Sequence, residues 1–218
     1  VMYMDKMFSG CSSLAALDLS AFDTSQVRRM DRMFSGCSSL ATLNLAGLDT
    51  SNVTDMGNMF RSCTSLVSLD LSGIKTSQVT NMGEMFSGCA SLASLDLSGF
   101  DTSMVTDMNY MFYNCSSLSS LDISGFDTSR LLNSSLMFEG CRRLAYISVS
   151  SKATNISLPR IEVNGHADWF SVAERKWFTV SEIESSRRGI ADTYAKEEID
   201  ISLDRLAIEL SQRQFTYD

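Results

Sequence analysis

Hydrophobic positions along this chain recur every 26 residues. Each period holds a Met-Phe pair, a cysteine three residues after the phenylalanine and a leucine three residues after the cysteine. The cysteines mark the interval throughout, at Cys11, Cys37, Cys63, Cys89, Cys115 and Cys141. A unit of this length cannot bury an apolar face alone, so the period predicts stacked units in a solenoid.

Within each period, the polar and apolar positions predict a strand, a turn and a helix. In the fourth copy, Leu95 and Leu97 alternate with polar residues, which is typical of a strand with one buried face. Residues 99–103 then form a turn whose polar side chains can cap the next element. Asn114, or glycine in most other copies, is expected to end the helix in a left-handed conformation. The helix itself is predicted from apolar residues at helical spacing, Val105, Met108, Met111, Phe112 and Cys115.

Repeated strand-helix units predict an α/β solenoid with its short parallel strands side by side. Because parallel strands lie ~4.8 Å apart and a helix is ~10 Å wide, we expect a curved, right-handed stack with the strands on its concave face. We assign the solenoid to residues 1–158, as five full copies with partial ends. Val1 aligns with the middle of a unit, so we expect further repeat sequence upstream in the parent protein.

Beyond a last predicted strand at residues 146–149, the repeat pattern ends. Asp-Trp-Phe at 168–170 and Lys-Trp-Phe-Thr at 176–179 predict an aromatic hairpin, followed by a short helix from Ser181. We expect the hairpin to cover the open apolar end of the last unit, with a carbohydrate-stacking platform as the alternative. Residues 159–198 are assigned to this cap. Residues 199–218 are assigned to a linker and the first strand of a truncated following module.

The unit GCxSLxxLDLSxFDTSxVTDMxxMF resembles the 26-residue bacterial surface-protein repeat of the BspA-like leucine-rich repeat group, over residues 1 to about 150. Residues 168–194 also resemble the segment that often follows such arrays, and residues 210–218 are similar to the opening strand of bacterial immunoglobulin-like modules. The resemblance implies a secreted or wall-attached bacterial protein with a role in adhesion or host contact. It implies no catalytic residues, and family membership is an analogy for function.

Composition argues against several functions. A net charge of −8 gives no basic stripe for a nucleic-acid partner. The chain has no apolar run of ~18 residues, so we expect no membrane insertion. The single histidine, His166, lies in a loop-like stretch and is not expected to form a catalytic triad. We therefore expect no enzymatic activity and no cofactor.

A column of outward polar residues on the predicted strands is the main candidate for metal chemistry. Its members are Asp18, Asn44, Asp70, Asp96 and Asp122. Adjacent carboxylates ~4.8 Å apart repel by ~1 kcal/mol in water. We therefore favour hydrogen bonds from neighbouring serines or turn amides, with calcium bridging by Asp70, Asp96 and Asp122 as the alternative. The aspartates of the Asp-Thr-Ser turns are predicted to be turn caps, at Asp23, Asp49, Asp101 and Asp127.

The copies differ most at the exposed positions of the predicted helices. Arg and Tyr are enriched at interface hot spots, whereas the strand columns carry small, monotonous residues. We therefore expect partner contacts on the helical face or at the aromatic end. The candidate residues are Arg28, Arg29, Arg32, Tyr110, Tyr113 and Trp169. This predicts an extracellular, adhesin-like monomer that binds a host or bacterial surface protein or glycan. The alternatives are a structural spacer and a calcium-stabilised scaffold.

All six cysteines are predicted to be reduced and buried in one column. They are related by the repeat translation, so neighbouring side chains point in parallel. A disulfide needs Cβ atoms ~3.8 Å apart, which parallel side chains on stacked units do not reach. Buried thiols pack as small apolar groups.

Overall fold

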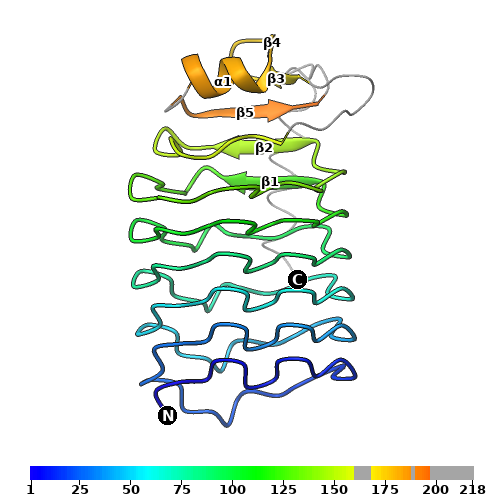
Figure 1. The fold of residues 1–218 in the computed structure, drawn as a ribbon, viewed down its shortest axis with the longest axis vertical. Coiled ribbons are helices and arrows are strands. Elements are labelled where there is room, and N and C mark those ends of the chain that lie inside the picture. The colour runs from blue at the N-terminus through cyan, green and yellow to red at the C-terminus, as the bar shows by residue number, and fades with distance from the viewer. Residues whose placement is uncertain (160–167, 188–189, 197–218) are drawn as a thin grey trace.

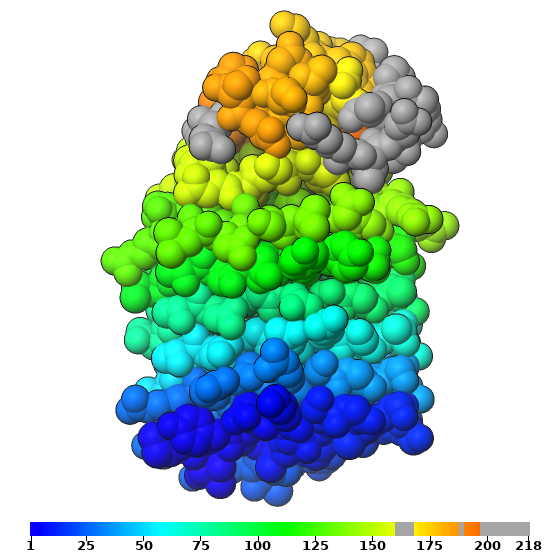
Figure 2. All heavy atoms as spheres, viewed as in Figure 1, coloured from blue at the N-terminus to red at the C-terminus, as the bar shows by residue number. Residues whose placement is uncertain are grey.

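The computed structural model of the protein describes residues 1–159, 168–187 and 190–196. The chain winds into flat coils stacked along one axis, with a small mixed region at the C-terminal end (Figure 1). Parallel bridges join residues 26 apart, from Tyr3↔Arg29 through to Asp107↔Asn133. We number the coils by their phenylalanine, from coil 1 with Phe8 to coil 6 with Phe138. The space-filling view shows the coils as continuous bands (Figure 2).

The predicted helices of the coils are absent, and this expectation was wrong. The segment from Met82 to Cys89 is a series of turns: the Met85 amide donates to the Met82 carbonyl at 3.2 Å, and the Cys89 amide to Phe86 at 3.1 Å. Alternate amides donate instead to the next coil, as from Phe86 to Met111 at 2.9 Å. Every second N–H in this segment thus donates to the next coil. In a helix these N–H groups would donate to carbonyls of the helix itself and could not link coils.

The left-handed residues explain why turns form with a helix-like apolar spacing. Gly88 and Glu84 have φ of 76° and 57°, each at the third position of a hydrogen-bonded turn. A positive φ there is what a type II turn requires. The left-handed conformation predicted for Asn114 and its equivalents is confirmed, but it closes a turn. A second left-handed column was not predicted: Lys6, Arg32, Asn58, Glu84, Tyr110 and Leu136.

Strand structure is confirmed only toward the C-terminal end of the stack. β1 (Ser120–Ile123) pairs in parallel with β2 (Tyr146–Val149), so that Ser120 lies opposite Tyr146. Leu95 and Leu97 are buried as predicted, but the segment that carries them forms no strand. Hydrogen bonds between coils are therefore denser on the turn side of the molecule than on this strand side.

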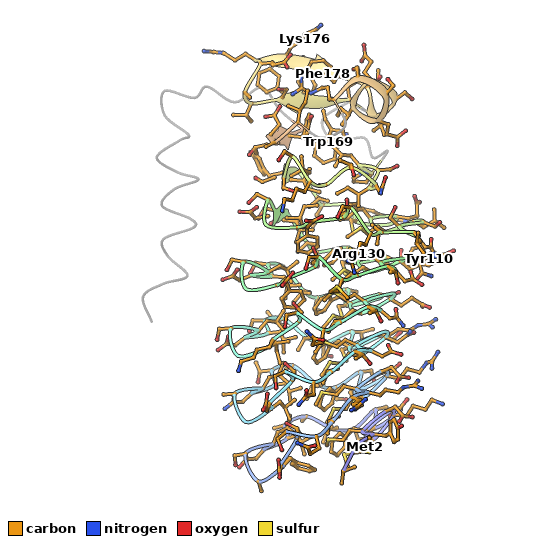
Figure 3. The ribbon with its side chains drawn as sticks, turned by 90° about the vertical axis from the view of Figure 1, so that its left-hand side faces the viewer. Met2, Tyr110, Arg130, Trp169, Lys176 and Phe178 are labelled. Atoms are coloured by element: carbon orange, nitrogen blue, oxygen red, sulfur yellow. The ribbon has the colours of Figure 1, made fainter. Side chains whose placement is uncertain are left out.

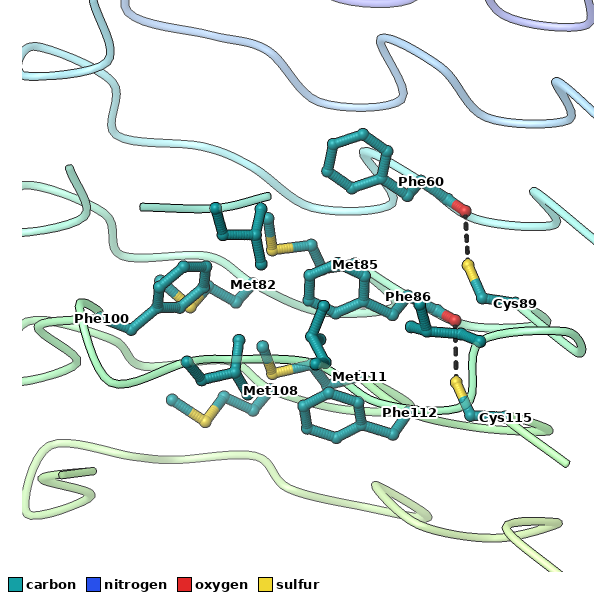
Figure 4. Packing of buried hydrophobic residues seen from close by; sticks show 14 of the residues in the cluster. Phe60, Met82, Met85, Phe86, Cys89, Phe100, Met108, Met111, Phe112 and Cys115 are labelled. Carbon is teal, nitrogen blue, oxygen red and sulfur yellow. Dashed lines mark hydrogen bonds between the residues drawn. The ribbon is translucent and has the colours of Figure 1, made fainter. Parts of the chain in front are cut away.

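Columns of identical side chains make the core. Six phenylalanines from Phe8 to Phe138 stack with ring centroids 5.5–5.8 Å apart and planes within 1–7° of parallel. The methionines pack beside them and are fully buried at Met82, Met85, Met108 and Met111 (Figure 4). The spacing of the rings barely exceeds the ~4.8 Å of parallel strands. Because no wide helical side exists, the reason for expecting a curved stack with a concave strand face does not hold, and Figure 1 shows the coils stacked along one axis.

Threonines of the Asp-Thr-Ser turns also link the coils. The buried Thr76 hydroxyl donates to the Asp101 carbonyl at 2.9 Å and accepts from the Asp101 amide at 2.8 Å. The same pairing recurs in the other coils at Thr24, Thr50 and Thr102. Asp101 itself accepts from the Ser103 amide at 3.0 Å, which confirms the predicted turn caps. In each turn, the Asp side chain therefore bonds within its own loop, and the Thr side chain bonds to the main chain of the next coil.

The C-terminal region, which we call the cap, continues the sheet of the coils. β3 (Trp169–Ser171) and β4 (Lys176–Phe178) form the predicted hairpin, and β5 (Asp192–Ala195) pairs antiparallel with both β2 and β3. The sheet order is β1-β2-β5-β3-β4. Helix α1 (Val180–Ser186) begins after Thr179, which forms a capping box with Glu182 in place of the expected start at Ser181. His166 and the predicted module at 199–218 lie outside the described residues.

Candidate binding surface

The turns expose one edge of the stack, which we call the turn edge. We define it by the second left-handed column, Lys6 to Leu136, and the exposed residues beside that column in each coil. Tyr110 points away from the stack at this edge (Figure 3). The main-chain groups here already bond to the next coil, as the Tyr110 amide does to Ser135 at 2.9 Å. The outward side chains are therefore not needed to hold the coils together.

Coil 2 brings two of the predicted contact residues, Arg29 and Arg32, together at one carboxylate. The Arg29 guanidinium contacts Asp31 through Nε and Nη2, both at 2.9 Å, and lies 3.8 Å from Asp55. Arg32 approaches the other oxygen of Asp31 at 3.6 Å. Asp31 is only 4% exposed, whereas Arg28, Arg29 and Arg32 are exposed. The bonds to Asp31 raise the pKa of Arg29 further above its ordinary value. One buried carboxylate thus orients two guanidinium groups that face solvent.

Coils 3 and 4 carry a further ion pair on the turn edge, between Arg61 and Glu84 at 2.9 Å. Beside it, Asp55 accepts hydrogen bonds from the Gly57 amide at 2.9 Å and from Asn81 at 3.0 Å. Burial raises the pKa of Asp55 despite these bonds. Polar residues therefore bridge adjacent coils along this part of the edge.

Coils 5 and 6 end the turn edge in an apolar patch. Tyr110 and Tyr113, both predicted contact residues, meet edge to face with ring centroids 5.3 Å apart and planes at 73°. Leu136 follows Tyr110 in the left-handed column and is 49% exposed, and Leu132 is 87% exposed. We call Tyr110, Tyr113, Leu132 and Leu136 the apolar patch. Sequence reasoning missed both leucines, although Leu132 departs from the threonines at the equivalent position of coils 3 to 5.

Trp169 cannot contact a ligand, which corrects its assignment as a contact residue. It is 0% exposed, and its Nε1 donates to the Pro159 carbonyl at 3.1 Å. The Lys196 ammonium lies 4.2 Å from the centre of its ring. Trp169 packs with the apolar core of the last coil, as the covering role predicts. The alternative of a carbohydrate-stacking platform fails for this ring because a sugar needs an open aromatic face.

The acidic column binds its own backbone. Asp70, Asp96 and Asp122 accept hydrogen bonds from the amides two residues later at 2.9, 2.9 and 2.8 Å. This confirms the interpretation that turn amides satisfy the column. The Ser72 amide is the main reason that the pKa of Asp70 is lowered. In the described part of the chain, no group of three or more His, Cys, Asp or Glu residues lies close enough to hold a metal ion.

The cysteines are all free, as predicted, and five of the six are buried. The thiol of Cys89 donates to the Phe60 carbonyl of the preceding coil at 3.1 Å, and Cys115 bonds likewise to Phe86 (Figure 4). Burial raises the pKa of Cys63 and Cys141 to about 12. Cys11 is exposed, so the predicted burial was wrong for that residue. The thiols of Cys63 and Cys141, protonated at neutral pH, are poor nucleophiles.

A buried polar cluster joins the elements of the cap. Arg187 donates to the Tyr194 hydroxyl at 2.8 Å, to Asp192 at 2.7 Å and to Glu174, and its guanidinium lies 4.4 Å from the centre of the Phe178 ring. Ser171 also donates to Asp192. These groups satisfy one another, which is typical of a structural network.

A shallow groove of about 500 Å³ lies between β1, β2 and the cap, lined partly by Asp122, Ser148, Asp192 and Thr193. The hydroxyls of Ser148 and Thr193 bond to each other at 2.9 Å. Asp122 bonds to the Ser124 amide and Asp192 to Arg187. The polar groups of the groove therefore have partners within the protein, and they include no His or Cys that could act as base or nucleophile.

Comparison with known proteins identifies the family. The family model described as "Mycoplasma protein of unknown function, DUF285" matches residues 1–93 and 66–155, and the chain belongs to this family. The crystal structure of the T. pallidum leucine-rich repeat protein is similar, with 24% sequence identity, a TM-score of 0.45, and coverage of 66% of this chain and 72% of that one. No curated protein matches the sequence. Among the described residues, no helix is long and apolar enough to cross a membrane.

Proposed function

We propose that this protein is a non-enzymatic interaction module that binds a protein partner through its turn edge. The proposal rests mainly on where the coils differ. Their buried columns repeat the same residue types, whereas the turn edge changes from arginines in coil 2 to tyrosines in coil 5 and leucines in coil 6. Arg and Tyr are enriched at interface hot spots, and the fold itself requires none of them at these positions.

The resemblance to bacterial surface-protein repeats supports an adhesin-like role for this module, outside the cell and against a host or neighbouring-cell surface. The strand side offers a poorer contact surface, because its outward residues are small or have carboxylates already bonded to the chain. Stacked repeats present extended surfaces of this kind, on which separate coils contribute separate contacts.

Binding to arrays of matrix proteins, cell-surface proteins and glycans tests this function. A variant with alanine at Arg28, Arg32, Tyr110 and Tyr113 should lose the interactions that the wild-type protein makes. A strand-side variant, Asp70→Ala with Asp96→Ala, is the control and should keep them. The opposite pattern would place the contact surface on the strand side. A wild-type protein that binds nothing on these arrays would favour a structural spacer.

A further inference from the structure

Coil 2 departs from coils 3, 4 and 5 at four of five consecutive positions, and shares with coil 1 only the Asp followed by a basic residue, there Asp5 and Lys6, and the methionine before them. Residues 28–32 read Arg-Arg-Met-Asp-Arg, where coils 3, 4 and 5 begin Thr-Asp-Met, Thr-Asn-Met and Thr-Asp-Met. Only the buried Met30 is kept. Because three other coils fold with different residues at these positions, the requirements of the stack do not explain this group.

The departure gives up a local hydrogen bond that the other coils make. Asp55, Asn81 and Asp107 each accept from the amide two residues later at 2.9 Å. At the equivalent position, Arg29 has no acceptor oxygen. Its guanidinium is held instead by Asp31, which stands where coils 3 and 4 have glycine. Coil 2 therefore exchanges a turn-stabilising acceptor for a cation positioned by a buried carboxylate.

Neighbouring coils extend this positive surface. Lys6 precedes Arg32 in the left-handed column and is exposed, and Arg61 lies in coil 3. Asp31 is shared by Arg29 and Arg32, Arg29 also lies 3.8 Å from Asp55, and Arg61 is paired with Glu84. No ion pair is formed by Lys6 or Arg28 among the described residues, so the positive charge is partly neutralised and is concentrated on coils 1 and 2. A local basic site thus stands on a protein whose net charge is −8. We call Lys6, Arg28, Arg29, Arg32 and Arg61 the basic site.

We propose that the basic site binds carboxylate groups of an acidic segment in the partner protein, an inference that rests on the proposed function. Guanidinium groups present paired N–H donors that match a carboxylate, and Asp31 holds two of them in place before binding. The site extends from coil 1 to coil 3, roughly 10 Å at about 5 Å per step between coils. It therefore accommodates a few acidic side chains.

A protein segment fits the turn edge better than a long polyanion. A nucleic acid or sulfated polysaccharide that extends past coil 3 meets Glu84, whose charge is already paired with Arg61, and further along it meets the exposed Glu139, which repels it. A protein segment can place acidic residues on the basic site and apolar residues on Tyr110 and Leu136. The change from basic residues in coils 1 and 2 to apolar residues in coils 5 and 6 therefore favours a protein segment as the partner. It also sets the orientation of that segment, with its acidic end on the basic site.

Fluorescence anisotropy with a labelled hexaglutamate peptide tests this site. We expect the wild-type protein to bind it at low salt and to bind more weakly at about 0.15 M salt, where the Debye length is ~8 Å. The test variant combines Arg28→Thr, Arg29→Asn, Asp31→Gly and Arg32→Asn, which are residues that coils 3 and 4 already carry. It should remain folded and weaken binding by roughly tenfold or more, because it removes charge-assisted bonds.

The control variant is Arg142→Ala with Arg143→Ala, which makes the net charge more negative by the same two units at an exposed site in coil 6. It should bind the peptide as the wild type does. Equal weakening in both variants, no binding by the wild type, or tighter binding of a heparin oligosaccharide or single-stranded DNA through the same residues would overturn the inference. Because the arrays test the whole turn edge, loss of this inference leaves their result standing.

Discussion

The coils and the cap bury apolar side chains by different means. In the coils, each side chain packs on its own copy one coil away, as Phe86 does on Phe60 and Phe112. In the cap, unlike groups meet around Arg187, and each contact occurs once. The difference teaches how to interpret sequence variation. A residue in one coil can be compared with the residues at the equivalent positions of the other coils, which is how the arginines of coil 2 are recognised as unusual. A residue of the cap has no equivalent position elsewhere in the chain.

The largest effect is expected where a column is broken in its centre. Phe86→Ala removes a fully buried ring that is stacked on both sides, and should lower the free energy of unfolding by about 3–5 kcal/mol. Urea unfolding measures the change. Glu84→Ala, on the turn edge of the same coil, is the control and should cost less than about 1 kcal/mol. A similar cost for both would mean that the phenylalanine column does not carry the stability of the coils.

In the cap, Arg187→Leu should destabilise by about 3 kcal/mol, because it leaves Asp192 buried without its cation. Chemical unfolding followed by tryptophan fluorescence reports this region, since both tryptophans lie in it. A second variant, Arg187→Leu with Asp192→Leu, should recover part of the loss. If the double variant is less stable than the single one, the ion pair is not the source of the effect.

A smaller effect separates two threonines in the same coil. Thr76→Val removes a buried hydroxyl that both donates to and accepts from Asp101, and should cost about 1–2 kcal/mol. Thr80→Val removes an exposed hydroxyl that only donates, to the Thr54 carbonyl at 3.2 Å. It should lower the free energy of unfolding by only a few tenths of a kcal/mol. Thermal or urea unfolding of the two variants compares them directly. Equal costs would contradict the role of the buried threonines in linking coils.

Thiol labelling distinguishes Cys11 from the buried column. Without denaturant, one thiol of the six should react with a thiol reagent at neutral pH, and all six should react after unfolding in the absence of reductant. More than one fast thiol in the native state would show that the column is open to solvent.

The same thiols predict a pH dependence. Folding raises the pKa of Cys63 and Cys141 to about 12 from an ordinary value of 9.0, so the folded state holds protons that the unfolded state has lost. Their contribution to stability is complete below pH 9 and is lost as pH rises from 9 toward 12. The melting temperature should fall over that range. Replacing both cysteines with alanine should reduce the slope, and an unchanged slope would rule these thiols out as its cause.

Sequence reasoning predicted the buried columns but mistook the backbone that presents them. Val105, Met108 and Met111 are buried as a helical spacing requires, yet turns place them at the same spacing, because Tyr110 and Asn114 are left-handed. Tyrosine, arginine and leucine do not indicate a left-handed turn position in a sequence, since these residues disfavour a positive φ. The hydrogen bonds between coils, which favour turns over a helix at this spacing, join residues far apart in sequence and could not be predicted from the local pattern.

The candidate site was predicted in part for the same reason. The exposure of Arg28, Arg29 and Arg32 could be predicted, because variable positions of a repeat lie outside its core whatever the backbone does there. That these arginines, Tyr110 and Tyr113 contact a partner stays a prediction. Trp169 was misjudged because its surroundings are formed by residues distant in sequence, including Lys196. The buried position of Asp31 beneath two arginines also needed the fold.

Photo-crosslinking tests most directly whether the turn edge is the contact surface. One variant carries p-benzoylphenylalanine in place of Tyr110 on the turn edge, and a second carries it in place of Ser120, exposed on β1 of the strand side. Each is illuminated with the cell-surface and matrix proteins of the arrays. We predict adducts of higher mass from the probe at position 110 and none from the probe at position 120. Adducts from position 120 alone would contradict the assignment of the turn edge as the binding surface.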